Sequence, residues 1–229
     1  YNTLLSYALE DSFVTSIKTI AKNDLNIYVD PQIRGLRQIS NSRLLELIYD
    51  DSNLKMKFIE NVKQNLKLAS ERNPELDIKG IEVELAMSAE YRLVPETWPE
   101  VLEKNWILPI EDKYILTELP ISRREEMGYI KPVEEFRRLI SMGLTPILPH
   151  PERYFYLSHD ELLRYIDAGA VIQCNYGSLA GLYGPEAQAR ALAIVNEGLV
   201  TFYGTDMHNL KYVKIIGEWF NQGHLIAEY

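Results

Sequence analysis

The sequence has one cysteine, no long apolar run and no excess of basic residues, and each shortage excludes a class of protein. Because Cys174 is the only cysteine among 229 residues, no disulfide can form within the chain. No segment approaches the roughly 20 consecutive apolar residues that a membrane-spanning helix needs. The first residues also lack the basic and apolar parts of a secretion signal. We therefore expect a cytoplasmic protein without a membrane span.

Basic residues are outnumbered by acidic ones. The chain has 24 Lys and Arg against 33 Asp and Glu, for a formal net charge of −9 at pH 7. A nucleic-acid backbone would meet mostly repulsion, so a nucleic-acid partner is not expected. A length of 229 residues, 46% of them hydrophobic, fits one hydrophobic core. The prediction is a single domain over residues 1–229.

The signatures of serine and cysteine nucleophiles are also missing. The sequence contains no Gly-x-Ser-x-Gly elbow, no Cys-x5-Arg phosphate loop and no glycine-rich nucleotide fingerprint. Cys174 lies in the apolar run 170–174, which is typical of an inert buried thiol. Covalent catalysis through either residue type is therefore not expected.

Short β-branched runs alternate with longer stretches of helical period along most of the chain. The runs that read as strands are 27–29, 81–85, 114–117, 145–148, 170–174 and 199–203. Strands separated by helices indicate parallel pairing through βαβ units. Helix signals agree with this alternation: residues 158–161 fit a capping box, Pro185 suits a first turn, and Gly169 and Gly198 suit helix ends.

Polar side chains follow these apolar runs at several separate points. Glu118, His150, Asp206 and His208 come directly after predicted strands, and Glu90 follows the run that ends near Ala86. In barrels, active-site residues come from the carboxyl ends of several strands, whereas an open sheet uses one or two loops at a switch point. The distribution therefore predicts an α/β fold and favours a barrel.

The polar residues form two short patterns that suit metal and phosphate chemistry. Asp206 and His208 are two residues apart, so an extended backbone would direct both to one side. His150 lies between two prolines, and Arg153 can make bidentate contacts with phosphate. Oxygen ligands mixed with imidazoles suit Mn²⁺, Fe²⁺ or Zn²⁺. Metal-assisted hydrolysis of a phosphoester is the chemistry that these residues predict.

The same residues lie in a series of motifs that resembles a known family. The matching segments are 88–91, 115–120, 143–154, 177–179 followed by Gly184, 197–200 and 205–209. In order and spacing they resemble the bacterial metal-dependent protein-tyrosine phosphatases of capsule and exopolysaccharide synthesis, in the PHP superfamily. The resemblance implies a distorted TIM-like (β/α)7 barrel, a cluster of metal ions that is usually manganese, and phosphotyrosine on the tail of a partner kinase as substrate.

The resemblance also implies roles for individual residues. By motif, the metal ligands would be Glu90, Glu118, His150, Asp206 and His208. Arg153 resembles the arginine that binds phosphate in the family, and Lys211 aligns with a second family arginine. By the same resemblance, Arg153, Lys211 and Asp206 would be the catalytic residues.

Two parts of the family pattern have no match in this sequence. Residues 1–9 contain no His-x-His, and Gln32 occupies the position of a family histidine, where an amide is a weak ligand. We expect an incomplete metal cluster, and residues upstream of Tyr1. Three hypotheses stay open: a phosphotyrosine phosphohydrolase, a catalytically impaired relative that acts as a binding or regulatory module, and a hydrolase of a small sugar or amino-alcohol phosphate.

Overall fold

A computed structural model describes residues 56, 60, 64, 88–207 and 210–223, with only the backbone at 210 and 211. The chain divides into two compact units, one formed by 1–87 with 208–214 and the other by 88–207 with 215–229. The five strands and every described helix before α9 (Leu210–Asn221) belong to the second unit. The single domain expected over residues 1–229 stays a prediction.

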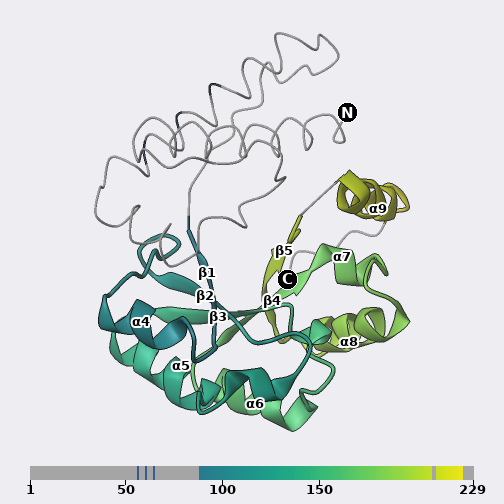
Figure 1. The fold of residues 1–229 in the computed structure, drawn as a ribbon. Coiled ribbons are helices and arrows are strands. Elements are labelled where there is room, and N and C mark those ends of the chain that lie inside the picture. Colours follow the sequence, from purple (N-terminus) through teal and green to yellow (C-terminus); the bar gives the residue numbers. More distant parts are fainter. Residues whose placement is uncertain (1–55, 57–59, 61–63, 65–87, 208–209, 224–229) are drawn as a thin grey trace. The chain divides into compact units, whose positions relative to one another are not determined.

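Five parallel strands form the sheet of this unit (Figure 1). They are β1 (Glu90–Arg92), β2 (Tyr114–Glu118), β3 (Thr145–Pro149), β4 (Val171–Asn175) and β5 (Val200–Gly204), paired in chain order. Helices and helical turns connect them: α4 (Trp98–Glu103), η1 (Arg124–Met127), α5 (Pro132–Ser141), η2 (Pro151–Arg153), α6 (His159–Asp167), α7 (Tyr176–Leu179) and α8 (Pro185–Asn196), with α9 (Leu210–Asn221) after β5.

The helix ends follow from local sequence. Ser158 and Glu161 form the predicted capping box at the start of α6, since each side chain accepts a backbone N–H of the other residue. Pro185 is the first residue of α8, as predicted. Gly169 and Gly198 follow the last residues of α6 and α8 with positive φ angles, which glycine adopts without strain. These signals define where each helix leaves the sheet.

The core lies between the central strands and the helices around them. Ile115, Leu148 and Ile172 are fully buried on three consecutive strands, as expected for parallel strands covered on both faces. Helices α5 and α6 pack together through Phe136 and Tyr165, whose rings meet edge to face with centroids 5.6 Å apart. Burying an aliphatic side chain such as Ile115 or Leu148 stabilises the fold by about 1.5–3 kcal/mol.

The predicted strands and the observed strands agree in the middle of the chain. The runs at 114–117, 145–148, 170–174 and 199–203 match β2 to β5 to within one residue at each end. The runs at 27–29 and 81–85 lie outside the described residues. Strand β1 was not predicted, and Glu90 is its first residue. This strand is only three residues long and is exposed at both ends, so it carries no apolar run.

The sheet is open over the part of the chain that the structure describes. Strands β1 and β5 are its two edges, and neither pairs with the other. The finding is an α/β fold with a parallel five-stranded sheet, and the closed barrel is not confirmed. Among the described helices, none has both the length and the apolar character that crossing a membrane would require.

Candidate metal centre

The strands of a parallel sheet end at one edge, and polar residues gather there. Glu118 is the last residue of β2, His150 directly follows β3, Asn175 ends β4, and Asp206 comes two residues after β5. Catalytic residues of α/β enzymes lie at such carboxyl edges. Glu118, His150 and Asp206 thus lie at or just after the carboxyl ends of strands, as predicted.

The backbone at His150 is shaped by its neighbours. The residue has φ 39° and ψ 51°, in the left-handed region, between Pro149 and Pro151. Its N–H donates to the Gln173 carbonyl at 2.7 Å, and its own carbonyl accepts from Arg153 N at 2.9 Å. A left-handed residue other than glycine costs on the order of 1 kcal/mol, which such contacts offset. The strained turn holds the imidazole in a buried position, where the side chain is 2% exposed.

Two carboxylates meet this imidazole. His150 Nε2 lies 3.6 Å from Glu90 Oε1 and 3.7 Å from Glu118 Oε1. One donor atom from each of the three side chains lies within 4.8 Å of the other two. These residues belong to β1, β2 and the turn after β3, so three neighbouring strands build the group. We call Glu90, Glu118 and His150 the three-donor group.

The electrostatics of the three-donor group fit a divalent cation. Burial raises the pKa of Glu118, and the negative charge of Glu90 raises it further, while His150, Arg92 and Arg153 lower it. Two carboxylates this close repel each other unless a positive charge lies near both. Arg92, the nearest base on β1, already donates to Glu126 at 2.8 Å. Carboxylate oxygens with one imidazole are suitable ligands for Mn²⁺, Fe²⁺ or Zn²⁺.

A second polar group lies beside the first and is centred on Asp206. Arg153 Nη1 and Asn175 Nδ2 both donate to Asp206 Oδ2, at 2.8 Å and 3.0 Å. The Tyr183 hydroxyl is 3.5 Å from the same oxygen, and the Arg153 guanidinium lies 4.2 Å from the centroid of the Tyr183 ring. Within the described residues, Asp206 is therefore not a member of the three-donor group, but is the partner of Arg153.

The side chains of the other predicted site residues lie outside the described part of the chain. His208 and Gln32 lie outside the described residues. Lys211 belongs to α9, where its backbone alone is described. Their roles stay predictions. Cys174 is fully buried, which confirms that part of the prediction, and burial raises the pKa of its thiol, as expected for an unreactive cysteine.

Sequence reasoning missed three residues of this edge. Asn175 has the same position behind an apolar run as the predicted residues, so the rule that found them applies to it too. Glu152 is fully buried, and its Oε1 accepts the Asn175 N–H at 3.0 Å. Tyr183 contacts Arg153, and Gly177 leaves space beside it: a Cβ there would lie 3.2 Å from the Tyr183 ring and 3.0 Å from Leu182. No local pattern indicates such a long-range contact.

The fold and the site define an α/β protein in which three side chains that could hold a metal ion meet at the carboxyl edge of a parallel sheet. The family described as "Capsular polysaccharide synthesis, CpsB/CapC" matches residues 36–214. The chain belongs to this family. The resemblance found in the sequence motifs is thereby confirmed.

Two curated proteins and one solved structure are similar to this chain. The tyrosine-protein phosphatase YwqE of Bacillus subtilis is 29% identical over 145 residues, which cover 62% of this chain and 56% of YwqE. CapC of Staphylococcus aureus is 25% identical over 205 residues, covering 88% and 78%. A chain from the crystal structures of Bacillus subtilis YwqE and Streptococcus pneumoniae CpsB, described as metal-dependent tyrosine phosphatases, aligns with a TM-score of 0.51 and 25% identity. That alignment covers 72% of this chain and 66% of the solved chain. The match thus spans less than two thirds of YwqE.

Proposed function

We propose that this chain is a divalent-metal-dependent phosphohydrolase that acts on phosphotyrosine. The observation that carries the proposal is the convergence of Glu90, Glu118 and His150 from three neighbouring strands. The metal dependence and tyrosine phosphatase activity that are named for similar proteins agree with this chemistry. Asp206 and His208 would complete the ligand set, and manganese is the proposed metal.

The described side chains have separate parts in the proposed reaction. Glu90, Glu118 and His150 would hold the metal, which when bound supplies Lewis-acid chemistry that activates water and offsets phosphoryl charge. Arg153 presents a planar guanidinium whose remaining N–H groups can donate to phosphoryl oxygens. Asp206 and Tyr183 hold that guanidinium by an ion pair and a ring contact. Lys211 would add a second positive charge near the substrate.

The proposal extends to the rest of the molecule. We propose that the fold of the chain is a distorted TIM-like (β/α)7 barrel of the PHP type. The proposed substrate is phosphotyrosine on the tail of a capsule or exopolysaccharide kinase, and the proposed location is the cytoplasm. The capsule-synthesis family to which the chain belongs supports this choice of substrate.

Metal content and hydrolysis test the proposal together. The full chain would be stripped with EDTA, reloaded with Mn²⁺, Zn²⁺ or Mg²⁺, and assayed with para-nitrophenyl phosphate and a phosphotyrosine peptide. We expect turnover only with metal. The substitution Glu118→Gln should lower kcat/KM on the order of 100-fold or more, because a ligand is lost. Glu186→Gln, on an exposed residue of α8, is the control. No hydrolysis with any divalent ion contradicts the proposal.

The second candidate is a catalytically impaired relative that acts as a binding or regulatory module. Gln32 in place of a family histidine, and the absence of His-x-His from residues 1–9, favour it. This candidate predicts that the wild-type chain binds a phosphotyrosine peptide without hydrolysing it. The substitution Gln32→His should then raise metal affinity while the circular dichroism spectrum stays unchanged. Unchanged metal affinity counts against this candidate.

A further inference from the structure

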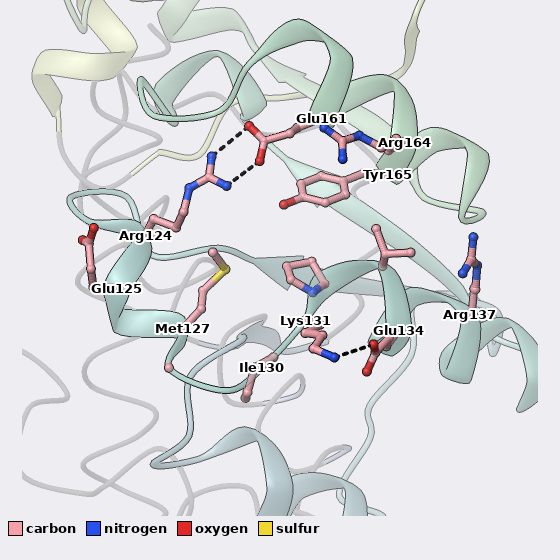
Figure 2. A pocket seen from close by; sticks show the side chains of 13 residues that line it. Arg124, Glu125, Met127, Ile130, Lys131, Glu134, Arg137, Glu161, Arg164 and Tyr165 are labelled. Carbon is pink, nitrogen blue, oxygen red and sulfur yellow. Dashed lines mark hydrogen bonds and ion pairs between the residues drawn. The ribbon is translucent and has the colours of Figure 1, made fainter.

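A pocket lies outside the three-donor group, between η1, the first turn of α5 and helix α6 (Figure 2). Its volume is about 610 Å³, within the range of small-ligand and peptide side-chain sites. Met127, Ile130, Pro132 and Tyr165 provide apolar lining, and charged side chains surround them. The pocket can therefore accommodate one or two side chains with both apolar and polar parts.

Two basic side chains that line the pocket have no acidic partner among the described residues. Arg124 donates to Glu161 through two hydrogen bonds, and Lys131 donates to Glu134 at 2.9 Å. Arg137 of α5 and Arg164 of α6 have no acidic partner among the described residues, and both are exposed. The lining acid Glu125 also has no basic partner there, but Figure 2 shows it on the opposite side of the pocket. One side of the pocket is thus basic on a chain of net charge −9.

The turn η1, which lines the pocket, is hydrogen-bonded to strand β1 of the candidate metal centre. Helical turn η1 contributes Arg124 and Met127 to the pocket, while its Glu126 accepts a hydrogen bond from Arg92 at 2.8 Å. Arg92 is two residues after Glu90 on β1. The turn η1 therefore links the pocket to the strand that carries Glu90.

The turn η1 is also connected, through Arg124 and Tyr156, to the segment that follows Glu118. Arg124 Nη2 donates to the Tyr156 carbonyl at 2.8 Å. The Tyr156 hydroxyl donates to the carbonyl of Pro120 at 2.6 Å, and Pro120 is two residues after Glu118. The turn η1 is therefore connected by hydrogen bonds to the segments that carry Glu90 and Glu118. The pocket and the three-donor group thus belong to one packed region.

We propose that this pocket binds acidic residues that flank the phosphotyrosine of a peptide substrate. Arg137 and Arg164 would pair with Asp or Glu carboxylates, and the apolar lining would contact the aliphatic stems. A net charge of −9 repels an acidic peptide overall, so such a peptide needs a local basic site. This inference rests on the proposed phosphotyrosine hydrolysis and adds the sequence class of the substrate.

Peptide selectivity tests the pocket. Two phosphotyrosine peptides of equal length would be compared, one with Asp and Glu flanking residues and one with Asn and Gln. We expect the wild-type chain to prefer the acidic peptide about fivefold to tenfold in kcat/KM, mainly through KM, because two partly exposed ion pairs contribute modestly. The preference should fall in 0.5 M NaCl, where such pairs are screened.

Three variants separate the pocket from general charge effects. The double substitution Arg137→Ala and Arg164→Ala should remove the preference and leave para-nitrophenyl phosphate hydrolysis unchanged. The control Arg138→Ala removes a neighbouring exposed arginine that does not line the pocket, and should keep the preference. Arg137→Glu with Arg164→Glu should reverse it in favour of a peptide with Lys flanking residues.

The outcomes distinguish this inference from the proposed function. If para-nitrophenyl phosphate is hydrolysed but the two peptides react equally, or the double variant keeps the preference, the pocket assignment is overturned and the proposed function stands. If nothing is hydrolysed, the proposed function fails, and fluorescence anisotropy of labelled acidic and neutral peptides on the full chain tests the pocket alone. Equal binding of both peptides overturns it.

Discussion

At the scale of single residues, Glu161 connects two stabilising devices. Its carboxylate accepts the Ser158 N–H in the capping box and also pairs with Arg124 across the pocket. The hydrogen bond from Arg124, together with the two contacts with Ser158, lowers the pKa of Glu161 to about 2, although partial burial acts in the opposite direction. One carboxylate thus fixes the start of α6 and attaches it to η1.

Replacing this carboxylate should destabilise the protein in a pH-dependent way. We expect Glu161→Gln to lower the free energy of unfolding at pH 7 by about 1 kcal/mol, since Arg124 is 41% exposed and solvent screens the pair. The folded pKa is below the ordinary value of 4.5. The contribution is therefore complete above about pH 4.5 and is lost as the pH falls towards about 2.

Urea denaturation at pH 7, 5, 4 and 3 measures this difference. The difference in the free energy of unfolding between wild type and Glu161→Gln should become smaller below pH 4.5. The control Glu186→Gln, on an exposed residue with no ion pair among the described residues, should have the same free energy of unfolding as wild type at each pH. A gap of constant size from pH 7 to pH 3 would show that the carboxylate charge is not the cause.

At the scale of elements, the contact between α5 and α6 depends on a glycine. Gly169 follows α6 with φ +100°, and a Cβ at this position would lie 2.7 Å from Ile140 Cγ1 on α5. Gly198 follows α8 with φ +69° and has open space around it. The two positions share a helix-ending conformation but differ in the packing around them.

This difference gives a matched pair of substitutions. We expect Gly198→Ala to cost about 1 kcal/mol of stability through backbone strain alone. Gly169→Ala should cost about 1 kcal/mol more, because Ile140 must also move. In the background Ile140→Ala the extra cost should disappear, which a double-mutant cycle by urea denaturation would measure. Equal losses for the two glycines would disprove the role of Ile140.

At the scale of the whole molecule, metal binding and folding should be coupled. A ligand that binds only the folded state stabilises it by mass action, by about 2.7 kcal/mol at a concentration 100 times its dissociation constant. For a chain of this size that corresponds to a Tm increase of roughly 5–10 °C. We expect Mn²⁺ or Zn²⁺ to raise the Tm of the EDTA-treated chain, as measured by differential scanning fluorimetry.

The variant Glu118→Gln separates metal binding from simple packing. Without metal it should be at least as stable as wild type, because it removes a partly buried carboxylate that Glu90 repels. With metal it should gain much less stability than wild type. A metal-induced increase in Tm that is equal in both proteins would place the cation elsewhere.

The sequence by itself determined the local features of this protein. Four strands, the capping box of α6 and the buried Cys174 follow from apolar runs, helix-start signals and burial preferences, which act over a few neighbouring residues. The motifs around Glu118, His150 and Asp206 also identified the family, because their order along the chain can be read without coordinates.

Only the tertiary structure decided which side chains meet. Strand β1 has no apolar run, and its pairing with β2 brings Glu90 to Glu118 and His150. The structure also brings Asp206 to Arg153 and Asn175, with Tyr183 beside it, while its role as a metal ligand stays a prediction. The pocket likewise joins α5, α6 and η1. These contacts depend on strand register and on the space left by residues such as Gly177, which no short-range pattern encodes.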